Sequence, residues 1–104
     1  MSAPAPIPAA DLDAAARCLR VLAHPDRLRI VEQLDLHRRV RVGDLAVALD
    51  LAPNAVSQHL NQMRAHGLLE PRRDGREVYY RIANPHVLNV LRCIRRYGTG
   101  KDRP

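Results

Sequence analysis

The chain has 104 residues, which is the size of one domain and leaves little room for a second. Its 17 Lys and Arg residues outnumber its 11 Asp and Glu residues, and the resulting formal charge of +6 favours a polyanionic partner. No apolar run approaches a membrane span, and no basic amphipathic helix with bulky aromatic residues is present, since the chain has no Phe or Trp and only three Tyr.

The two ends of the chain are predicted to lie outside the folded domain. Residues 1–8 are rich in Ala and Pro, lack the basic and long apolar regions of a signal peptide, and predict a disordered tail. Residues 9–97 should form one folded domain, and residues 98–104 a flexible tail. Two cysteines and no export signal predict a cytoplasmic protein.

Two helices are expected in the first third of the chain. Residues 9–23 carry an apolar stripe at helical spacing, and acidic residues lie near the positive end of that helix. His24 precedes Pro25 and should leave the helical region, so a second helix is predicted over residues 25–36. The stripe of the first helix consists of Leu12, Ala15, Ala16, Leu19, Leu22 and Ala23.

A short strand and a short helix are expected next. Residues 40–42 are predicted to add a strand to a later hairpin and so form a small sheet. Residues 42–49 predict a helix that buries Leu45, Ala46 and Leu49.

The following helix, residues 53–66, is the most informative stretch. It opens with Pro53, which suits a first helical turn, and stops at Gly67. One face is apolar, whereas another carries Asn and Gln side chains in place of the usual Lys and Glu. These amides both donate and accept hydrogen bonds, as reading base edges in a major groove requires. A merely solvated polar face is the alternative. The apolar face consists of Val56, Leu60 and Met63, and the polar face of Asn54, Ser57, Gln58 and Asn61.

Residues 69–82 form two extended runs around Asp74-Gly75, which predicts a two-residue β-hairpin. Arginines flank its tip, and guanidinium groups on a projecting hairpin suit phosphates or a narrow minor groove. Protection of an edge strand is the alternative role of these charges. The arginines are Arg72, Arg73 and Arg76.

The last helix is expected to start at Asn84-Pro85, with the Asn84 side chain as its N-cap. Its apolar stripe consists of Val87, Val90, Leu91, Ile94 and Tyr97.

Five blocks of this sequence, in order, resemble the ArsR/SmtB family of small bacterial repressors: residues 22–30, 44–46, 56–60, 67–69 and 74–82. The resemblance runs from about Leu12 to Tyr97. It implies a mainly α fold of about five helices with a small β-hairpin wing, a winged helix-turn-helix. It also implies a homodimer through the first and last helices that binds a palindromic operator and is released by an effector.

The sequence departs from the family pattern at several positions. Asp50 replaces the turn glycine, and Ala52 replaces the N-cap serine of the reading helix. Relatives that sense arsenic or cadmium carry Cys-x-Cys where this chain has residues 41–43. His86 matches one ligand of the family's zinc or nickel site, yet Asn84 stands two residues before it, and the positions expected for the second ligand pair fall near Tyr97 and Gly100. We therefore expect no metal and no cofactor.

Cys18 and Cys93 lie on helices that the resemblance places against each other. They can be two small core residues, a dithiol switch driven by oxidants or sulfane sulfur, or ligands of a soft metal. Nearby arginines favour a lowered thiol pKa and a reactive thiolate. These are Arg17, Arg20, Arg92 and Arg95.

The function predicted is sequence-specific binding of double-stranded DNA by a dimeric repressor with an unknown inducer. Gln58 and Asn61 are expected at base edges, with Asn54 beside them, while Ser57, His59 and Arg64 serve phosphates or bases. A metal-responsive repressor of the same fold and a winged-helix module that binds another protein are the alternatives. An enzyme is not expected, since the sequence shows no nucleophile paired with a base, no metal-binding cluster and no pair of catalytic carboxylates.

Overall fold

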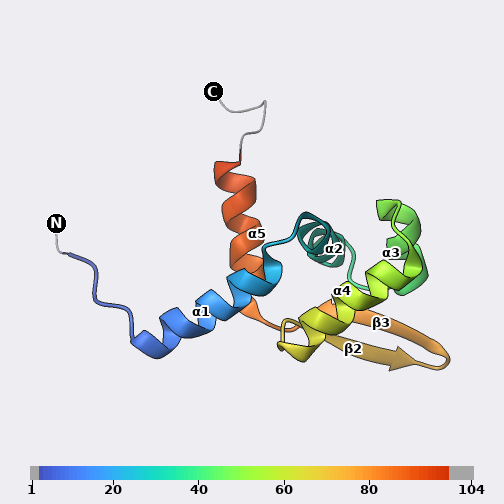
Figure 1. Ribbon diagram of the computed structural model, residues 1–104, viewed down its shortest axis with the longest axis horizontal. Coiled ribbons are helices and arrows are strands. Elements are labelled where there is room, and N and C mark those ends of the chain that lie inside the picture. Colours follow the sequence, from blue (N-terminus) through green and yellow to red (C-terminus); the bar gives the residue numbers. More distant parts are fainter. Residues whose placement is uncertain (1–2, 99–104) are drawn as a thin grey trace.

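The computed structural model describes residues 3–98, which fold into five helices and three strands (Figure 1). Their order is α1 (Ala9–Leu22), α2 (Pro25–Leu36), β1 (Val40–Arg41), α3 (Val42–Leu49), α4 (Pro53–Ala65), β2 (Leu69–Asp74), β3 (Glu77–Ile82) and α5 (Pro85–Tyr97). The predicted winged helix-turn-helix is confirmed, and the boundaries of the helices agree with the expected ones to within one residue. Predictions for residues 1–2 and 99–104 lie outside the described part of the chain.

The three strands form one antiparallel sheet in the order β1-β3-β2. β1 pairs through Val40 with Tyr80, and β2 pairs along its whole length with β3. Asp74 pairs with Glu77, so the two turn residues are Gly75 and Arg76, one residue later than predicted. Gly75 has a φ of 62°, and glycine at the first turn position is what a type II′ turn requires.

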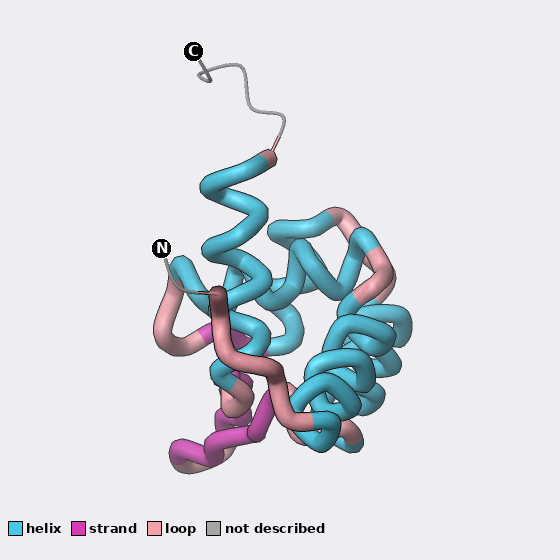
Figure 2. The backbone as a smooth tube through the Cα atoms, turned by 90° about the vertical axis from the view of Figure 1, so that its left-hand side faces the viewer, coloured by secondary structure: helices cyan, strands magenta, loops and turns pink. Residues whose placement is uncertain are grey.

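The core is aliphatic and gathers side chains from every element except the hairpin tip. α4 supplies Val56, Leu60 and Met63, each at most 1% exposed. They pack in one cluster with buried residues of α2, α3, β2 and α5. The strands lie together at the lower left in Figure 2 and run beneath α4 in Figure 1. Because the buried stripe of α4 faces this core, the opposite side of the helix is left in solvent.

Helix ends explain why the chain turns where it does. Asp50 takes the left-handed conformation that the missing glycine would have adopted, with φ 54° and ψ 49°. At the end of α4, Gly67 has a φ of 75°, and the Leu68 N–H donates to the Met63 carbonyl at 2.9 Å. His24 and Asn84 cap α2 and α5 by accepting from the backbone N–H groups of Asp26 and His86.

α1 and α5 extend away from the helix-turn-helix, α1 toward the lower left and α5 upward in Figure 1. Of the apolar stripe predicted for α1, only Leu22 is buried. Cys18 and Val21, which the prediction did not include, are the other residues of α1 that face the core. Leu12 and Leu19 are each 52% exposed, and Ile94 and Tyr97 on α5 are 45% and 65% exposed. No helix among the described residues is long and apolar enough to cross a membrane.

Ala52→Ser should stabilise the protein by about 1 kcal/mol, because Ala52 has the extended backbone of an N-cap but no side chain to accept from the first turn of α4. Thermal unfolding measures the change. The same substitution at exposed Ala48, inside α3, is the matched control and should destabilise by about 0.5 kcal/mol. Equal effects at the two positions would contradict the capping account.

Candidate nucleic-acid interface

The solvent face of α4 is polar and carries no acid. Asn54, Gln58 and Asn61 are exposed, as the periodicity predicted, and no Asp or Glu occurs between Pro53 and Ala65. Arg64 is exposed in the last turn, whereas Ser57 is half-buried. The arrangement offers amide donors and acceptors to a partner without a carboxylate that would repel phosphate.

His59 lies at the edge of this face and turns toward α2. Its Nδ1 accepts from the Arg27 Nε–H at 3.1 Å, and its ring meets that of His24 edge-on with centroids 4.6 Å apart. A cleft of about 500 Å³ opens beside this contact, lined by Arg27, Gln58, His59, Asn61 and Gln62. The predicted site residues Gln58, His59 and Asn61 are thus brought together, with Arg27 and Gln62 added to them.

The hairpin presents its arginines on a separate surface. Arg72, Arg73 and Arg76 are all exposed, and within residues 3–98 neither Arg73 nor Arg76 forms an ion pair. Arg72 pairs with Glu70 at 3.1 Å, and Arg81 pairs with the same carboxylate, whose pKa these guanidinium groups lower. A groove of about 310 Å³ is lined by Arg38, Arg39, Arg72, Arg73, Asp74, Tyr79, Tyr80 and Arg81.

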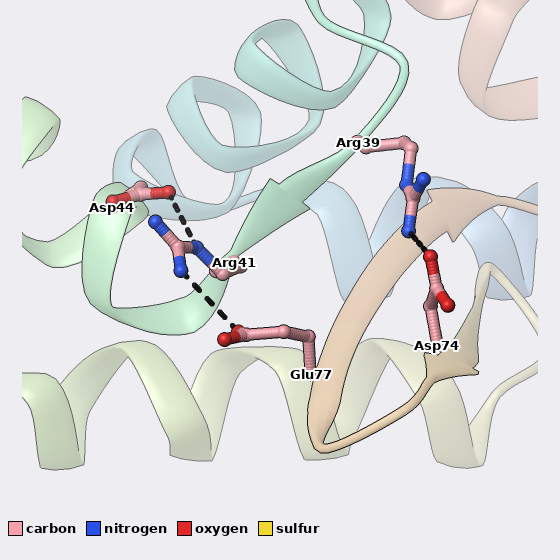
Figure 3. A network of polar contacts seen from close by, with 5 residues as sticks. All are labelled: Arg39, Arg41, Asp44, Asp74 and Glu77. Atoms are coloured by element: carbon pink, nitrogen blue, oxygen red, sulfur yellow. Dashed lines mark hydrogen bonds and ion pairs between the residues drawn. The ribbon is translucent and has the colours of Figure 1, made fainter.

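Two arginines around β1 tie the hairpin to the body of the protein (Figure 3). Arg39 donates to Asp74 at 2.6 Å, and its guanidinium carbon lies 4.1 Å from the centre of the Tyr79 ring. Arg41 pairs with Asp44 on α3 at 3.1 Å and with Glu77 on β3 at 3.4 Å. The two acids beside the hairpin turn are therefore each matched by an arginine, which leaves the free arginines to set the sign of the local potential.

One group of described residues has the composition of a metal site: His24, Asp26 and His59, whose ligand atoms lie within 4.8 Å of one another. Its hydrogen bonds do not fit a metal ion. His24 Nδ1 accepts from the Asp26 N–H, and His59 Nδ1 accepts from Arg27. The lone pair of each Nδ1 is therefore occupied by a hydrogen bond, so a metal ion at this group would have to displace both contacts. Asp26 also pairs with Arg29 at 2.9 Å.

The two cysteines line one small pocket between α1 and α5, of about 200 Å³, together with Ala15, Leu19, His86, Asn89 and Val90. Cys18 is buried and Cys93 is exposed. Burial raises the pKa of the Cys18 thiol. The expectation that nearby arginines would lower the pKa is therefore wrong for Cys18, because loss of hydration penalises its thiolate.

Sequence reasoning missed Arg27, Arg38, Arg39 and Gln62 as members of these surfaces. Gln62 continues the polar stripe of α4 by one turn from Gln58, so the periodicity contained that signal. The three arginines come from α2 and the segment after it, and only the tertiary fold brings them to α4 and the hairpin.

Comparison with known proteins gives the family. The pattern of a family described as a helix-turn-helix domain matches residues 22–72. The HTH-type transcriptional repressor SmtB of Mycobacterium tuberculosis is 44% identical over 88 residues, which is 85% of this chain and 64% of that protein. The transcriptional repressor PagR of Bacillus anthracis is 39% identical over 79 residues, which is 76% of this chain and 79% of that protein. The chain belongs to the ArsR/SmtB family of winged helix-turn-helix regulators.

Solved structures agree with this assignment. The transcriptional repressor PagR of Bacillus anthracis superposes with a TM-score of 0.76 at 38% identity, covering 82% of this chain and 97% of PagR. A homodimeric winged helix-turn-helix DNA-binding domain of Mycobacterium bovis, described as a possible ArsR-family regulator, superposes with a TM-score of 0.72 at 32% identity and covers 91% of this chain and 87% of that domain.

Proposed function

We propose that this ArsR/SmtB member is a transcriptional repressor that binds a palindromic operator as a homodimer and is released by an effector. The observation that carries the proposal is the exposed Asn and Gln face of α4, a helix without Asp or Glu, together with a hairpin on which Arg73 and Arg76 form no ion pair within residues 3–98. An amide-rich helix face reads base edges, and projecting guanidinium groups bind phosphate without regard to sequence.

Each α4 is proposed to enter a major groove, with Gln58 and Asn61 at base edges and Asn54 beside them. Ser57 and Arg64 flank this face and are assigned to the DNA backbone. Arg72, Arg73 and Arg76 are assigned to flanking phosphates or the minor groove. Two α4 helices of a dimer would then occupy successive major grooves about 34 Å apart.

The exposed apolar residues support dimerisation through α1 and α5. Six of the eight exposed large hydrophobic residues in the described chain lie on these helices or just before α1: Ile7, Leu12, Leu19, Leu88, Ile94 and Tyr97. A chain of this size buries only about two thirds of its unfolded surface, so covering this face would add stability. The dimeric state recorded for the M. bovis domain is consistent with this arrangement.

For the effector, we propose an oxidant that acts on the cysteines. Cys93 is exposed and reacts first to a sulfenic acid, and the Cys18 thiol then displaces water to form a disulfide. With hydrogen peroxide as the oxidant, the two thiols lose two electrons and two protons in total, and these reduce one peroxide molecule to two water molecules. Because both residues line the pocket between α1 and α5, the new bond would shift the helices that set the spacing of the two α4 helices.

Gln58→Ala should weaken operator binding by about 1 to 3 kcal/mol and relax specificity at one base pair, because it removes a base contact.

Arg73→Gln should instead weaken binding to all sequences. It should also reduce the slope of the logarithm of the binding constant against the logarithm of the salt concentration by about 1, because one phosphate contact is lost. Fluorescence anisotropy with operator and scrambled duplexes measures both. Arg29→Gln, which lies beside α5 and makes the same change in charge, is the control. Unchanged binding by Gln58→Ala would remove that residue from the interface, and weak, sequence-independent binding by the native protein would favour a protein-binding module.

Leu12→Asp should convert the dimer into a monomer, since it places a charge in the exposed apolar face of α1. The matched control is Leu36→Asp, a leucine exposed to a similar degree, 59% against 52%, at the end of α2. Sedimentation equilibrium measures the mass of each variant. A monomeric native protein, or a dimeric Leu12→Asp variant, would rule out this interface.

Peroxide treatment should lower operator affinity tenfold or more, about 1.4 kcal/mol, and a thiol reductant should restore it. Cys18→Ser and Cys93→Ser should each keep full affinity after the same treatment, because neither can form the disulfide. If both variants still release DNA, the cysteines are not the sensor.

A further inference from the structure

Arg27, in the first turn of α2, joins three helices. Its Nη1 donates to the carbonyl of Val21 in the last turn of α1 at 3.0 Å. Its Nε donates to His59 Nδ1 in the middle of α4 at 3.1 Å. One guanidinium group therefore connects α1, whose exposed face we assign to the dimer, with the helix that we assign to DNA.

The partners of Arg27 are themselves fixed. The His59 ring packs edge-on against His24, with an angle of 62° between the ring planes. His24 is held in turn, because its Nδ1 accepts from the backbone N–H of Asp26 at 3.1 Å. The contact is partly buried, which makes its hydrogen bonds stronger than those of a fully exposed pair.

The Arg27–His59 contact restrains the rotation of α4, which the apolar packing of that helix does not fix. Val56, Leu60 and Met63 hold α4 on the core, but such contacts are non-directional and permit small rotations and slides. The Arg27–His59 hydrogen bond is directional. It lies next to Gln58 and in the same cleft as Asn61, so a rotation of α4 that broke it would also move the proposed base-reading amides.

We propose that Arg27 is a positioning residue for operator recognition, which holds α4 in the reading orientation through His59 and requires the His59 ring to be neutral. The inference rests on the proposed DNA-binding function and names a residue that acts on DNA through another side chain. It also assigns His59 to the support of α4 rather than to a base.

The chemistry of the acceptor makes this contact sensitive to pH. Nδ1 can accept from Arg27 only through its lone pair, and protonation there would set two cations against each other. Burial, followed by the charges of His24 and Arg27, lowers the pKa of His59 from its ordinary value of 6.5, and Asp26 opposes this only partly. The neutral ring is thus stabilised by folding, and its contribution is lost as the pH falls through the lowered pKa.

The test compares operator with scrambled duplex in anisotropy titrations from about pH 8 down to about pH 5, the range in which histidine titrates. For the native protein, the ratio of the two affinities should stay constant near neutrality and fall by about five- to tenfold at the acidic end. Arg27→Gln should show a comparably reduced ratio already at neutral pH. His59→Asn, which keeps an acceptor near the position of Nδ1 but does not titrate, should give a ratio that does not change with pH.

NMR titration of the His59 ring supplies a readout that a merely structural role would not move. Arg27→Gln should raise the pKa of His59 toward 6.5. Arg17→Gln, an exposed position on α1 with the same change in charge, should leave both this pKa and the affinity ratio as in the native protein. Arg27→Lys should retain the charge but lose the native affinity ratio of operator to scrambled duplex. An ammonium group lacks the planar fork with which the guanidinium donates to both Val21 and His59.

If Arg27→Gln has the same affinity ratio as the native protein at neutral pH, and the pKa of His59 is unchanged, the inference is overturned. The proposed function would remain intact. Absence of operator preference in the native protein would instead overturn the proposed function. Circular dichroism and sedimentation of each variant separate loss of positioning from loss of fold.

Discussion

The structure depends above all on the burial of the apolar stripe of α4. Val56, Leu60 and Met63 are almost fully enclosed by side chains from the other elements, and this fixes which side of α4 meets solvent. At about 25 cal/mol per Å², burying such side chains outweighs the modest helix propensity of the Asn, Ser and Gln residues between them. The polar face can thus be chosen for recognition, because the other face supplies the stability.

The charged residues around the hairpin also have two separate roles, in pairing with nearby acids and in facing solvent. Acids near the hairpin turn are paired with Arg39 and Arg41 around β1, while Arg73 and Arg76 face solvent without an ion pair among the described residues. Exposed pairs of this kind add little stability, on the order of 0 to 1 kcal/mol. Their effect is electrostatic, since they cancel negative charge on the surface that would otherwise repel a polyanion.

Most of the fold was predictable because the helix ends are encoded locally. Pro53 and Pro85 begin helices, Gly67 ends one, and apolar periodicity identifies the buried faces. The hairpin turn was misplaced by one residue, since Gly75 adopts its positive φ equally well at either central position of a two-residue turn. The Arg27–His59 contact was not predictable, because it depends on neighbours distant in the sequence. Burial of the cysteines was one of the alternatives that the sequence left open, and it applies to Cys18 but not to Cys93.

Hydroxyl-radical footprinting of the DNA upstream of this protein's own reading frame tests the central claim most directly. Two α4 helices of one dimer should protect two patches about one helical turn, 10 to 10.5 base pairs, apart, with weaker protection outside them from the arginine hairpins. A single patch, or uniform protection that disappears with modest salt, would contradict the account of a dimeric, sequence-reading repressor.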